Sequence, residues 1–210
     1  MSRVQTLREN PAAVRKTGQI VVLLGPDGAG KSTLLSAIEQ QLATQDVSFK
    51  SYYFAPGYLK RYRPKGDGNI TTDPHNAPIN SQLKNFARLV LFLFEFRMGM
   101  PVVRRSTTLA LFDRHMIDML VDPKRYRMTP VRWWMRAMFR WIPKPDKVVV
   151  ITAPAQTIQD RKQEVPFEET VRQLQGYREL ATTYDSSLIA ENIGDPEETA
   201  SKIVDFIFSG

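Results

Sequence analysis

The sequence predicts an α/β fold built on a parallel sheet, and three observations lead to that prediction. Short, continuous runs of apolar and β-branched residues are typical of strands that are buried on both faces. These runs alternate along the chain with longer segments of helical periodicity. A glycine-rich segment at residues 25–32 joins the first run to the first helical segment. Strands that alternate with helices are connected by right-handed crossovers, so they run parallel to one another.

The expected strands and helices follow one another from residue 19 onward. Five segments have the composition of strands: Gln19–Leu24, Val47–Phe54, Leu109–Asp113, Lys147–Ile151 and Ser187–Ile193. Six segments are expected helices: Ser32–Leu42, Asn80–Met98, Thr129–Trp141, Pro154–Lys162, Pro166–Tyr184 and Pro196–Phe208. Three of these helices begin at a proline, which the first turn of a helix tolerates.

The composition excludes some classes of function but does not identify a single one. The chain has no cysteine, which excludes disulfides, cysteine-bound metals and thiol catalysis. A net charge of +7 favours anionic partners such as nucleotide phosphates, nucleic acid or an acidic membrane surface. Residues 1–16 lack the apolar stretch of a secretory signal, and the longest apolar run, Leu89–Phe94, is too short to span a bilayer. We therefore expect a cytoplasmic location.

The glycine-rich segment matches a nucleotide-binding pattern. It reads Gly25-Pro26-Asp27-Gly28-Ala29-Gly30-Lys31-Ser32, followed by Thr33. Its glycines let the backbone bend tightly and bring N–H groups against phosphate oxygens, at the positive end of the following helix. Lys31 can place its charge on the β- and γ-phosphates, and the hydroxyl of Ser32 can ligate Mg²⁺. The sequence therefore predicts a site for ATP with Mg²⁺. The alternative is a glycine-rich turn that only opens a helix.

An acidic residue ends the third expected strand. Asp113 follows four apolar residues, and P-loop enzymes carry a second carboxylate on the metal side of their site. Ligands of open α/β sheets bind at the carboxyl ends of the strands. Asp113 is therefore a candidate for the metal side of the nucleotide site. The alternative is an N-cap for a helix that begins near Arg114.

Several motifs resemble those of the thymidylate kinase family of nucleoside-monophosphate kinases. The resemblance runs from about residue 19 to residue 207 and is carried by four pieces of sequence. They are the loop Gly25–Thr33 with its acid at Asp27, the pair Asp113-Arg114, the helical pattern Phe167, Val171, Arg172, Tyr177, Leu180 and Ala181, and the junction Ile193, Asp195, Pro196 and Glu197. The resemblance implies a five-stranded parallel sheet and transfer of the γ-phosphoryl group of ATP to an acceptor.

The resemblance also implies roles for single residues. Asp113 would hold the acceptor and the metal ion, while Arg114 would bind phosphate. The family has a lid whose arginines close over the transferring group, and Arg161-Lys162 is its nearest counterpart here. Arg97 resembles the arginine of the family's acceptor site. The expected catalytic residues are therefore Lys31, Asp113, Arg114 and Arg161.

The stretch after Asp113-Arg114 departs from that family. The family continues with an aromatic residue, a Ser and an Ala-Tyr-Gln element that read the nucleoside. This chain instead has His115-Met116-Ile117-Asp118-Met119-Leu120-Val121-Asp122. The pattern also resembles a divergent branch that is associated with bacterial surface-polysaccharide pathways. The expected acceptor is therefore either dTMP or another nucleoside monophosphate, or else a sugar or glycan.

One domain accounts for residues 1–210, with two segments outside the family pattern. Residues 55–78 are rich in Pro, Gly, Asn and Asp, and they read either as a long loop on the acceptor side or as disordered chain. Residues 124–145 read as a basic aromatic helical insertion. Arg132, Arg136 and Arg140 are expected on one helix face, and Trp134, Met138 and Trp141 on another. Such a helix can rest on an anionic membrane or bind a partner. The alternative is a helix that packs on the core with a basic outer edge.

Three classes of function remain open at the level of sequence. The first is an ATP-dependent kinase that acts on a small anionic or hydroxylated acceptor. The second is an ATP-binding accessory protein without catalysis, and the third is a basic nucleic-acid-binding protein. No nucleic-acid-binding motif is recognised, so no specific nucleic acid is expected. A homodimer and peripheral contact with the inner face of a membrane are further expectations about partners and location.

Overall fold

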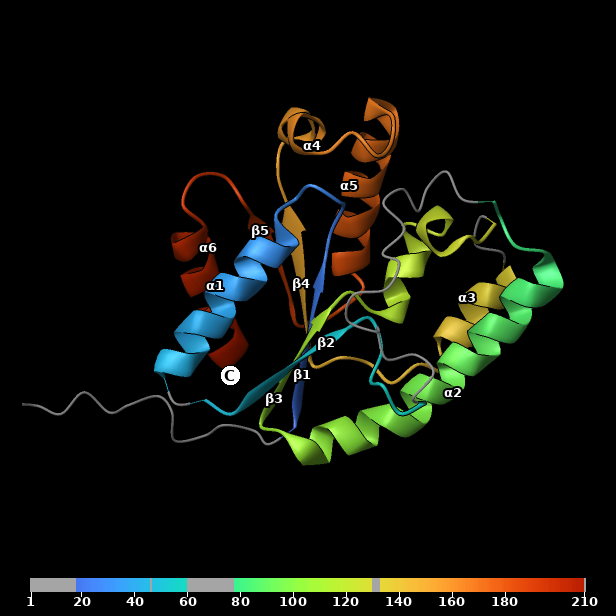
Figure 1. Cartoon of the computed structure of the whole chain (residues 1–210), viewed down its shortest axis with the longest axis horizontal. Helices are drawn as coiled ribbons and strands as arrows, with labels where there is room; N and C mark the ends of the chain where they lie inside the picture. Colours follow the sequence, from blue (N-terminus) through green and yellow to red (C-terminus); the bar gives the residue numbers. More distant parts are fainter. Residues whose placement is uncertain (1–17, 46, 60–77, 130–132, 210) are drawn as a thin grey trace, which may run out of the picture.

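A five-stranded parallel sheet lies at the centre of the computed structural model, which describes residues 18–45, 47–59, 78–129 and 133–209 (Figure 1). Its strands are β1 (Gln19–Leu24), β2 (Phe49–Tyr53), β3 (Leu109–Asp113), β4 (Lys147–Thr152) and β5 (Ser187–Glu191). Within these residues the strand order is β2-β3-β1-β4-β5, and every neighbouring pair is parallel. The predicted fold class, an α/β fold with a five-stranded parallel sheet flanked by helices, is therefore confirmed.

The central strand β1 shows why a continuous apolar run forms a strand here. Ile20, Val22 and Leu24 point into the apolar cluster on one face of the sheet. Val21 and Leu23 point into the cluster on the other face. All five side chains are fully buried, because side chains of a strand alternate between the two faces and both faces are covered.

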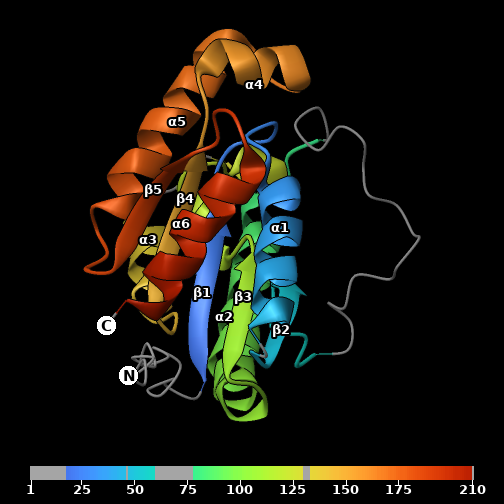
Figure 2. The same cartoon turned by 90° about the vertical axis from the view of Figure 1, so that its left-hand side faces the viewer.

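Helices cover both faces of the sheet. They are α1 (Lys31–Thr44), α2 (Gln82–Ser106), α3 (Trp133–Phe139), α4 (Ala155–Arg161), α5 (Phe167–Ala181) and α6 (Pro196–Phe208), with the short 3₁₀ helices η3 (Met116–Leu120) and η4 (Lys124–Tyr126). Figure 2 shows α1 and α6 side by side on one face of the sheet, with α2 behind it. None of the helices among the described residues is both long and apolar enough to cross a bilayer.

The longest helix exceeds its sequence prediction. We expect a helix to end near Met98 from the sequence, but α2 continues to Ser106, and Pro101 lies inside it. Proline removes one hydrogen bond from a helix and bends its axis, and α2 is visibly bent in Figure 1. The prediction was wrong here because the buried residues Met100 and Val103 hold the last turns against the core. Tertiary packing therefore overrides the local cost of the proline.

The segment after β2 is fixed against α2 by a buried carboxylate. Glu95 is fully buried and accepts hydrogen bonds from the backbone N–H groups of Tyr58 and Leu59, each at 2.6 Å. Gly99 allows close packing at the same place, since a Cβ there would lie 2.5 Å from the Cβ of Pro56. Only the first residues of the predicted loop at 55–78, together with residue 78, are described, because residues 60–77 lie outside the described part of the chain.

The basic aromatic segment at residues 124–145 is only partly helical. It contains η4 and the two-turn helix α3, and residues 130–132 lie outside the described part of the chain. Trp134 and Met138 pack against the core as partly buried residues, and the ring of Trp134 lies 5.6 Å from that of Phe86 on α2. Trp141 does not join them, since 66% of it is exposed. The three residues expected on one helix face are therefore divided between core and surface.

Candidate functional site

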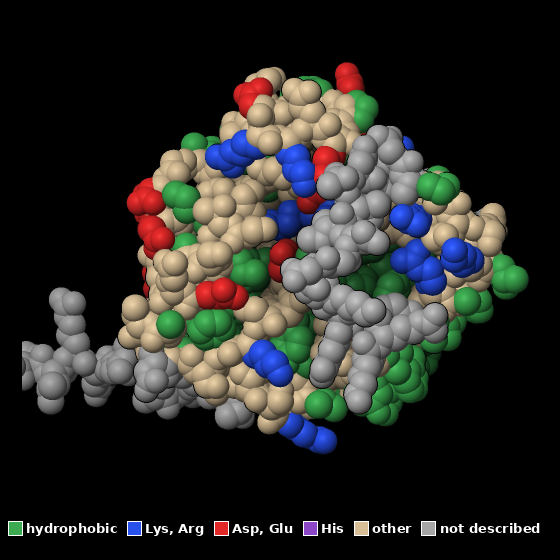
Figure 3. Space-filling view, in the orientation of Figure 1, with side chains coloured by type: hydrophobic (Ala, Val, Ile, Leu, Met, Phe, Trp, Pro, Cys, Tyr) green, Lys and Arg blue, Asp and Glu red, His purple; other side chains and the backbone are tan. Residues whose placement is uncertain are grey.

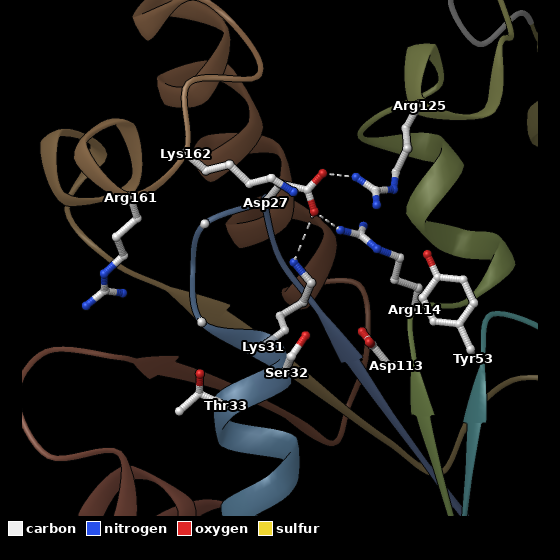
Figure 4. Close-up of a pocket in the computed structure, with 12 residues that line it drawn as sticks. Asp27, Lys31, Ser32, Thr33, Tyr53, Asp113, Arg114, Arg125, Arg161 and Lys162 are labelled. Atoms are coloured by element: carbon white, nitrogen blue, oxygen red, sulfur yellow. Dashed lines mark hydrogen bonds and ion pairs between the residues drawn. The ribbon is translucent and has the colours of Figure 1, made fainter. Parts of the chain in front are cut away.

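A cavity of about 400 Å³ lies at the carboxyl ends of β1 and β3 (Figure 4). The register of the sheet pairs Leu23 of β1 with Asp113 of β3, so the loop after β1 begins next to Asp113. Loops after neighbouring parallel strands meet at the same edge of a sheet, where ligands of such folds bind. The cavity is lined by Asp27, Gly28, Gly30, Lys31, Ser32, Thr33, Tyr53, Asp113, Arg114, Arg125, Arg161 and Lys162.

The glycine-rich loop has a backbone conformation that requires glycine at several positions, and two of them show why. Gly25 has φ +145°, and a Cβ at this position would lie 2.2 Å from the carbonyl oxygen of Ile151. Gly30 has φ +87°, and a Cβ there would lie 2.1 Å from the Nδ2 atom of Asn192. That Nδ2 group donates to the carbonyl oxygen of Ala29, at 2.9 Å. The side chain of Asn192, beside β5, therefore holds the loop in shape at the start of α1.

Lys31 is held over this loop. Its side chain is buried, and its Nζ atom donates to the carbonyl oxygens of Gly25 and Pro26 at 2.8 and 2.6 Å. Burial and then the nearby charge of Arg114 lower the pKa of Lys31 to about 7. A polyphosphate placed against the loop would favour the charged ammonium, because an opposite charge nearby raises the pKa of an amine. The carbonyl oxygens of Gly25 and Pro26 therefore hold the ammonium of Lys31 at the floor of the cavity.

The carboxylate of Asp27 lies next to three cationic side chains in the cavity. Its Oδ1 atom lies 3.8 Å from the Nζ atom of Lys31 and contacts the guanidinium of Arg114. Its Oδ2 atom contacts the guanidinium of Arg125, which comes from η4 (Figure 4). One carboxylate thus faces three cations. The arrangement leaves net positive charge for an anionic ligand, and it links the loop to two arginines that lie 87 and 98 positions later in the chain.

Arg114 is fixed by a buried network behind the cavity. Its Nη1 atom donates to Asp118 at 2.7 Å, and the same carboxylate accepts from the hydroxyls of Tyr126 and Tyr177 at 2.6 and 2.5 Å. Burial alone would lower the pKa of Arg114, but the Asp118 carboxylate raises it well above its usual range. Arg114 also has φ +71°, a conformation that costs free energy for a residue with a side chain and clusters at functional sites. The guanidinium is therefore permanently charged and rigidly placed.

Asp113 carries a side-chain oxygen that no group in the described part of the chain satisfies. Its Oδ1 atom is buried and has no hydrogen-bond partner among the described residues. Buried carboxylate oxygens are normally paired, so an unpaired oxygen that lines a polar cavity fits a ligand that the chain itself does not supply. The hydroxyl of Ser32 lines the same cavity. Hydroxyl and carboxylate oxygens are ligands that Mg²⁺ accepts, with water and substrate phosphates completing the shell. The described residues contain no cluster of three acidic or histidine side chains for a metal.

The structure brings most of the predicted site residues together, with one exception. Arg161, at the end of α4, lines the cavity together with Lys162, and Figure 4 shows its side chain on the Thr33 side of the loop. Arg97 does not line the cavity and is exposed on α2. Successive residues of a helix are about 100° apart, so the turn that buries Glu95 directs Arg97 elsewhere. Whether each lining residue acts in catalysis stays a prediction.

Two lining residues escaped the sequence-level site prediction. Tyr53 ends β2 next to Asp113 in the sheet register, and Arg125 lies in the short helix η4. The position of Tyr53 near the end of an expected strand could have indicated its place in the site, because the ends of neighbouring strands meet at the same edge of the sheet. Arg125 belongs to the basic segment at residues 124–145, and nothing in the neighbouring sequence distinguishes it from the other cations of that segment. Only the position of η4 over the cavity assigns it to the site.

Comparisons with known proteins agree with this fold. A family model described as ABC transporter matches residues 13–95, which is less than half of the chain and includes the glycine-rich loop. The solved structure of deoxyadenosine kinase from M. mycoides with bound dATP superposes with a TM-score of 0.57 at 15% sequence identity. That superposition covers 91% of this chain and 100% of the kinase. The chain has an α/β P-loop fold. No curated protein matches the sequence.

The lowered pKa of Lys31 predicts how nucleotide affinity depends on pH. In the free protein, Lys31 loses its proton as the pH rises through about 7, whereas the bound triphosphate holds it protonated. Binding above pH 7 therefore takes up a proton, and we expect the affinity for ATP to fall by up to about tenfold per pH unit there. Isothermal titration calorimetry between pH 6 and 9, in buffers of different ionisation enthalpy, measures both the affinity and the proton uptake.

A charge-removing variant provides the control for this pH dependence. Lys31→Met keeps an unbranched apolar stem but cannot titrate, so its weak residual binding is expected to change little between pH 7 and pH 9. Any change in the ionisation of ATP itself over that range contributes equally to both proteins. Equal slopes of affinity against pH for the native chain and the variant would contradict the assignment to Lys31.

Proposed function

We propose that this chain transfers the γ-phosphoryl group of ATP to a small anionic acceptor. The observation that carries the proposal is the composition of one cavity. On one side lies a glycine-rich loop with Lys31 and Ser32, which suits a polyphosphate. On the other side lie Arg114 and Arg125, with Asp113 between the two sides. A protein that only bound ATP would need the first side alone.

The phosphate side provides charge compensation. Phosphoryl transfer requires alignment of donor and acceptor and neutralisation of charge on the transferring group, with little covalent chemistry from the protein. Lys31 and the N–H groups at the start of α1 would bind the β- and γ-phosphates. Ser32 and Asp113 would hold Mg²⁺, which neutralises phosphate charge when it is bound. Arg161, on the Thr33 side of the loop, would stabilise the nucleotide from the far end of α4.

The acceptor side favours a phosphate or another anion over a neutral alcohol. Arg114 is rigid and cannot lose its proton, and a guanidinium binds phosphate oxygens in pairs. Arg125 reaches the same place from η4, and Asp27 pairs with both groups. An acceptor phosphate would replace Asp27 as their partner. A phosphate acceptor needs no general base, whereas Asp113 would take the proton of a hydroxyl acceptor.

The resemblance to thymidylate kinases supports a nucleoside monophosphate as the acceptor, and the departures after Arg114 favour something else. Where that family reads the nucleoside, this chain places Asp118. That carboxylate is fully buried and is occupied by Arg114, Tyr126 and Tyr177. It is therefore not free to contact a base. Within the proposal, a sugar phosphate or a phosphorylated glycan fits this arrangement better than dTMP.

An acceptor screen combined with one substitution tests the proposal. ADP release from ATP is followed in the presence of dTMP, other nucleoside monophosphates and sugar phosphates. With a true acceptor we expect turnover of roughly 1–100 s⁻¹, as is typical of kinases. Arg125→Ala is expected to raise the KM for the acceptor by about tenfold or more, because a charge-assisted contact is lost, while the KM for ATP changes little.

The matched control is Arg105→Ala, which removes an exposed arginine of α2 that lies outside the cavity. It is expected to leave both KM values unchanged. An equal increase of both KM values in Arg125→Ala would contradict a specific role at the acceptor. ATP binding without phosphoryl transfer to any acceptor would instead favour an accessory ATP-binding protein.

A further inference from the structure

The outer half of α2 is almost as apolar as its inner half. Its inner half packs on the sheet through residues such as Leu89, Phe92 and Phe96. A helix that is hydrophobic all round is normally buried on all sides, yet this one is open along its outer side within the described structure. The exposed apolar residues of that side are Leu83, Phe86, Val90, Leu91, Phe94, Met98 and Val102.

Two exposed tryptophans lie at the start of α3 and just after its end. The helix α3 packs on α2, where the rings of Trp134 and Phe86 lie 5.6 Å apart. Trp133, beside that contact, is 79% exposed, and Trp141 is 66% exposed. Tryptophan at a surface is typical of membrane interfaces, where its ring sits at the level of the lipid headgroups. We call the combined surface of α2 and α3 the α2–α3 face.

The charges around the α2–α3 face are mostly positive. One exposed carboxylate, Asp146, lies beside it and already pairs with Arg104 of α2 at 2.7 Å. Between residues 78 and 145 the acidic residues are Glu95, Asp113, Asp118 and Asp122. Three of these are buried, and Asp113 lines the cavity. Figure 3 shows hydrophobic and basic side chains over the α2 and α3 side of the molecule, and acidic side chains gathered mainly on the opposite side. The exposed cations of this region are Lys84, Arg97, Arg105, Lys124, Arg136, Arg140 and Lys144.

This distribution of charge favours an anionic partner. A second copy of the chain, packed through the same helix, would bring the cations of both copies together, and the exposed carboxylate beside this region, Asp146, is already paired with Arg104. An anionic lipid surface supplies the missing negative charge and also accepts the apolar side chains. We propose that the α2–α3 face is a docking surface for the anionic lipid headgroups of a bilayer.

Vesicle binding without any nucleotide tests this proposal separately from the proposed kinase activity. The full chain is floated with vesicles of phosphatidylcholine alone and of phosphatidylcholine mixed with phosphatidylglycerol. We expect binding to the mixed vesicles, with affinity at least about tenfold higher than for the neutral ones, since each basic side chain near an anionic surface strengthens binding several-fold. Absence of binding, or equal binding to both vesicles, overturns the proposal.

Two paired variants locate the surface. The double substitution Arg136→Glu and Arg140→Glu on α3 is expected to weaken binding to the mixed vesicles by at least about tenfold. The matched control reverses two exposed cations elsewhere, Arg178→Glu on α5 and Lys202→Glu on α6, and should retain most of the binding. Equal loss in both pairs would show a response to net charge alone and would overturn the assignment to this face.

A single labelled position distinguishes a bilayer from a second copy. Because the chain has no cysteine, Phe94→Cys gives one site for a fluorophore that reports the polarity around it. The expected result is polar surroundings in solution and a blue shift only with anionic vesicles. A blue shift without vesicles, together with a doubled mass in light scattering, would assign the face to a dimer and overturn the proposal. A blue shift without vesicles in a monomer would assign it to another segment of the same chain and overturn it equally.

Discussion

Lys31→Ala is expected to lower the rate of phosphoryl transfer from ATP by about 10²–10³-fold, since the loss of one preorganised charge or donor at a developing negative charge costs that much. Lys31 lies at the floor of the cavity, where two loop carbonyls and Asp27 hold its ammonium. Alanine removes the cation but leaves the backbone N–H groups of the loop. Some affinity for nucleotide should therefore remain while catalysis is lost.

The comparison of binding with catalysis makes this test informative. Steady-state ADP release gives the rate, and a fluorescent ATP analogue gives the affinity of the same preparation. The shape of the loop is checked by the melting temperature, which should stay near that of the native protein. An unchanged rate in Lys31→Ala would remove the glycine-rich loop from the reaction and with it the proposed function. Arg105→Ala serves again as the control outside the cavity.

Asp118→Ala is expected to destabilise the folded chain by about 3–5 kcal/mol, the usual cost of removing one partner from a buried ion pair. Asp118 is fully buried and is the common acceptor for Arg114, Tyr126 and Tyr177. Without it, a buried guanidinium loses one of its two carboxylates, and two buried hydroxyls lose their acceptor. Since a domain of this kind is stable by only about 5–15 kcal/mol, the loss would be a large part of the total.

Urea unfolding measures this effect, and an exposed pair provides the contrast. Glu198 pairs with Lys202 on the surface of α6 at 2.7 Å, and both side chains are more than two-thirds exposed. Removing that carboxylate with Glu198→Ala is expected to change stability by no more than about 1 kcal/mol. A loss of similar size in the two variants would show that the network around Asp118 contributes little. Asp118→Asn, which keeps the shape and one acceptor oxygen, should fall between them.

Lys31 and Asp118 contribute to the proposed reaction in different ways. Lys31 lines the cavity and would contact the nucleotide directly, whereas Asp118 lies behind the cavity wall and would act through Arg114. Loss of Asp118 should therefore reduce activity mainly by loosening Arg114, in parallel with the loss of stability. Loss of Lys31 should reduce activity in a protein that remains folded.

Local sequence determined the parts of this protein whose physics is local. The apolar run at β1 specifies a strand buried on both faces, and the pattern Gly25–Ser32 specifies a phosphate loop, because tight turns need glycine and a polyphosphate needs backbone N–H groups and a lysine. The alternation of strands and helices gave the parallel sheet. Each of these inferences depends on residues that are close together in the chain.

Only the tertiary structure decided which distant residues meet at the cavity. Arg125 joins Asp27 across 98 positions of sequence because η4 folds over the end of the sheet, while Arg97 stays outside because of the rotation of α2 about its axis. The same packing carried α2 past Pro101, against the local preference for ending there. Distant side chains meet because whole helices and strands are placed next to one another. That placement depends on the burial of many residues together, so no short motif encodes it.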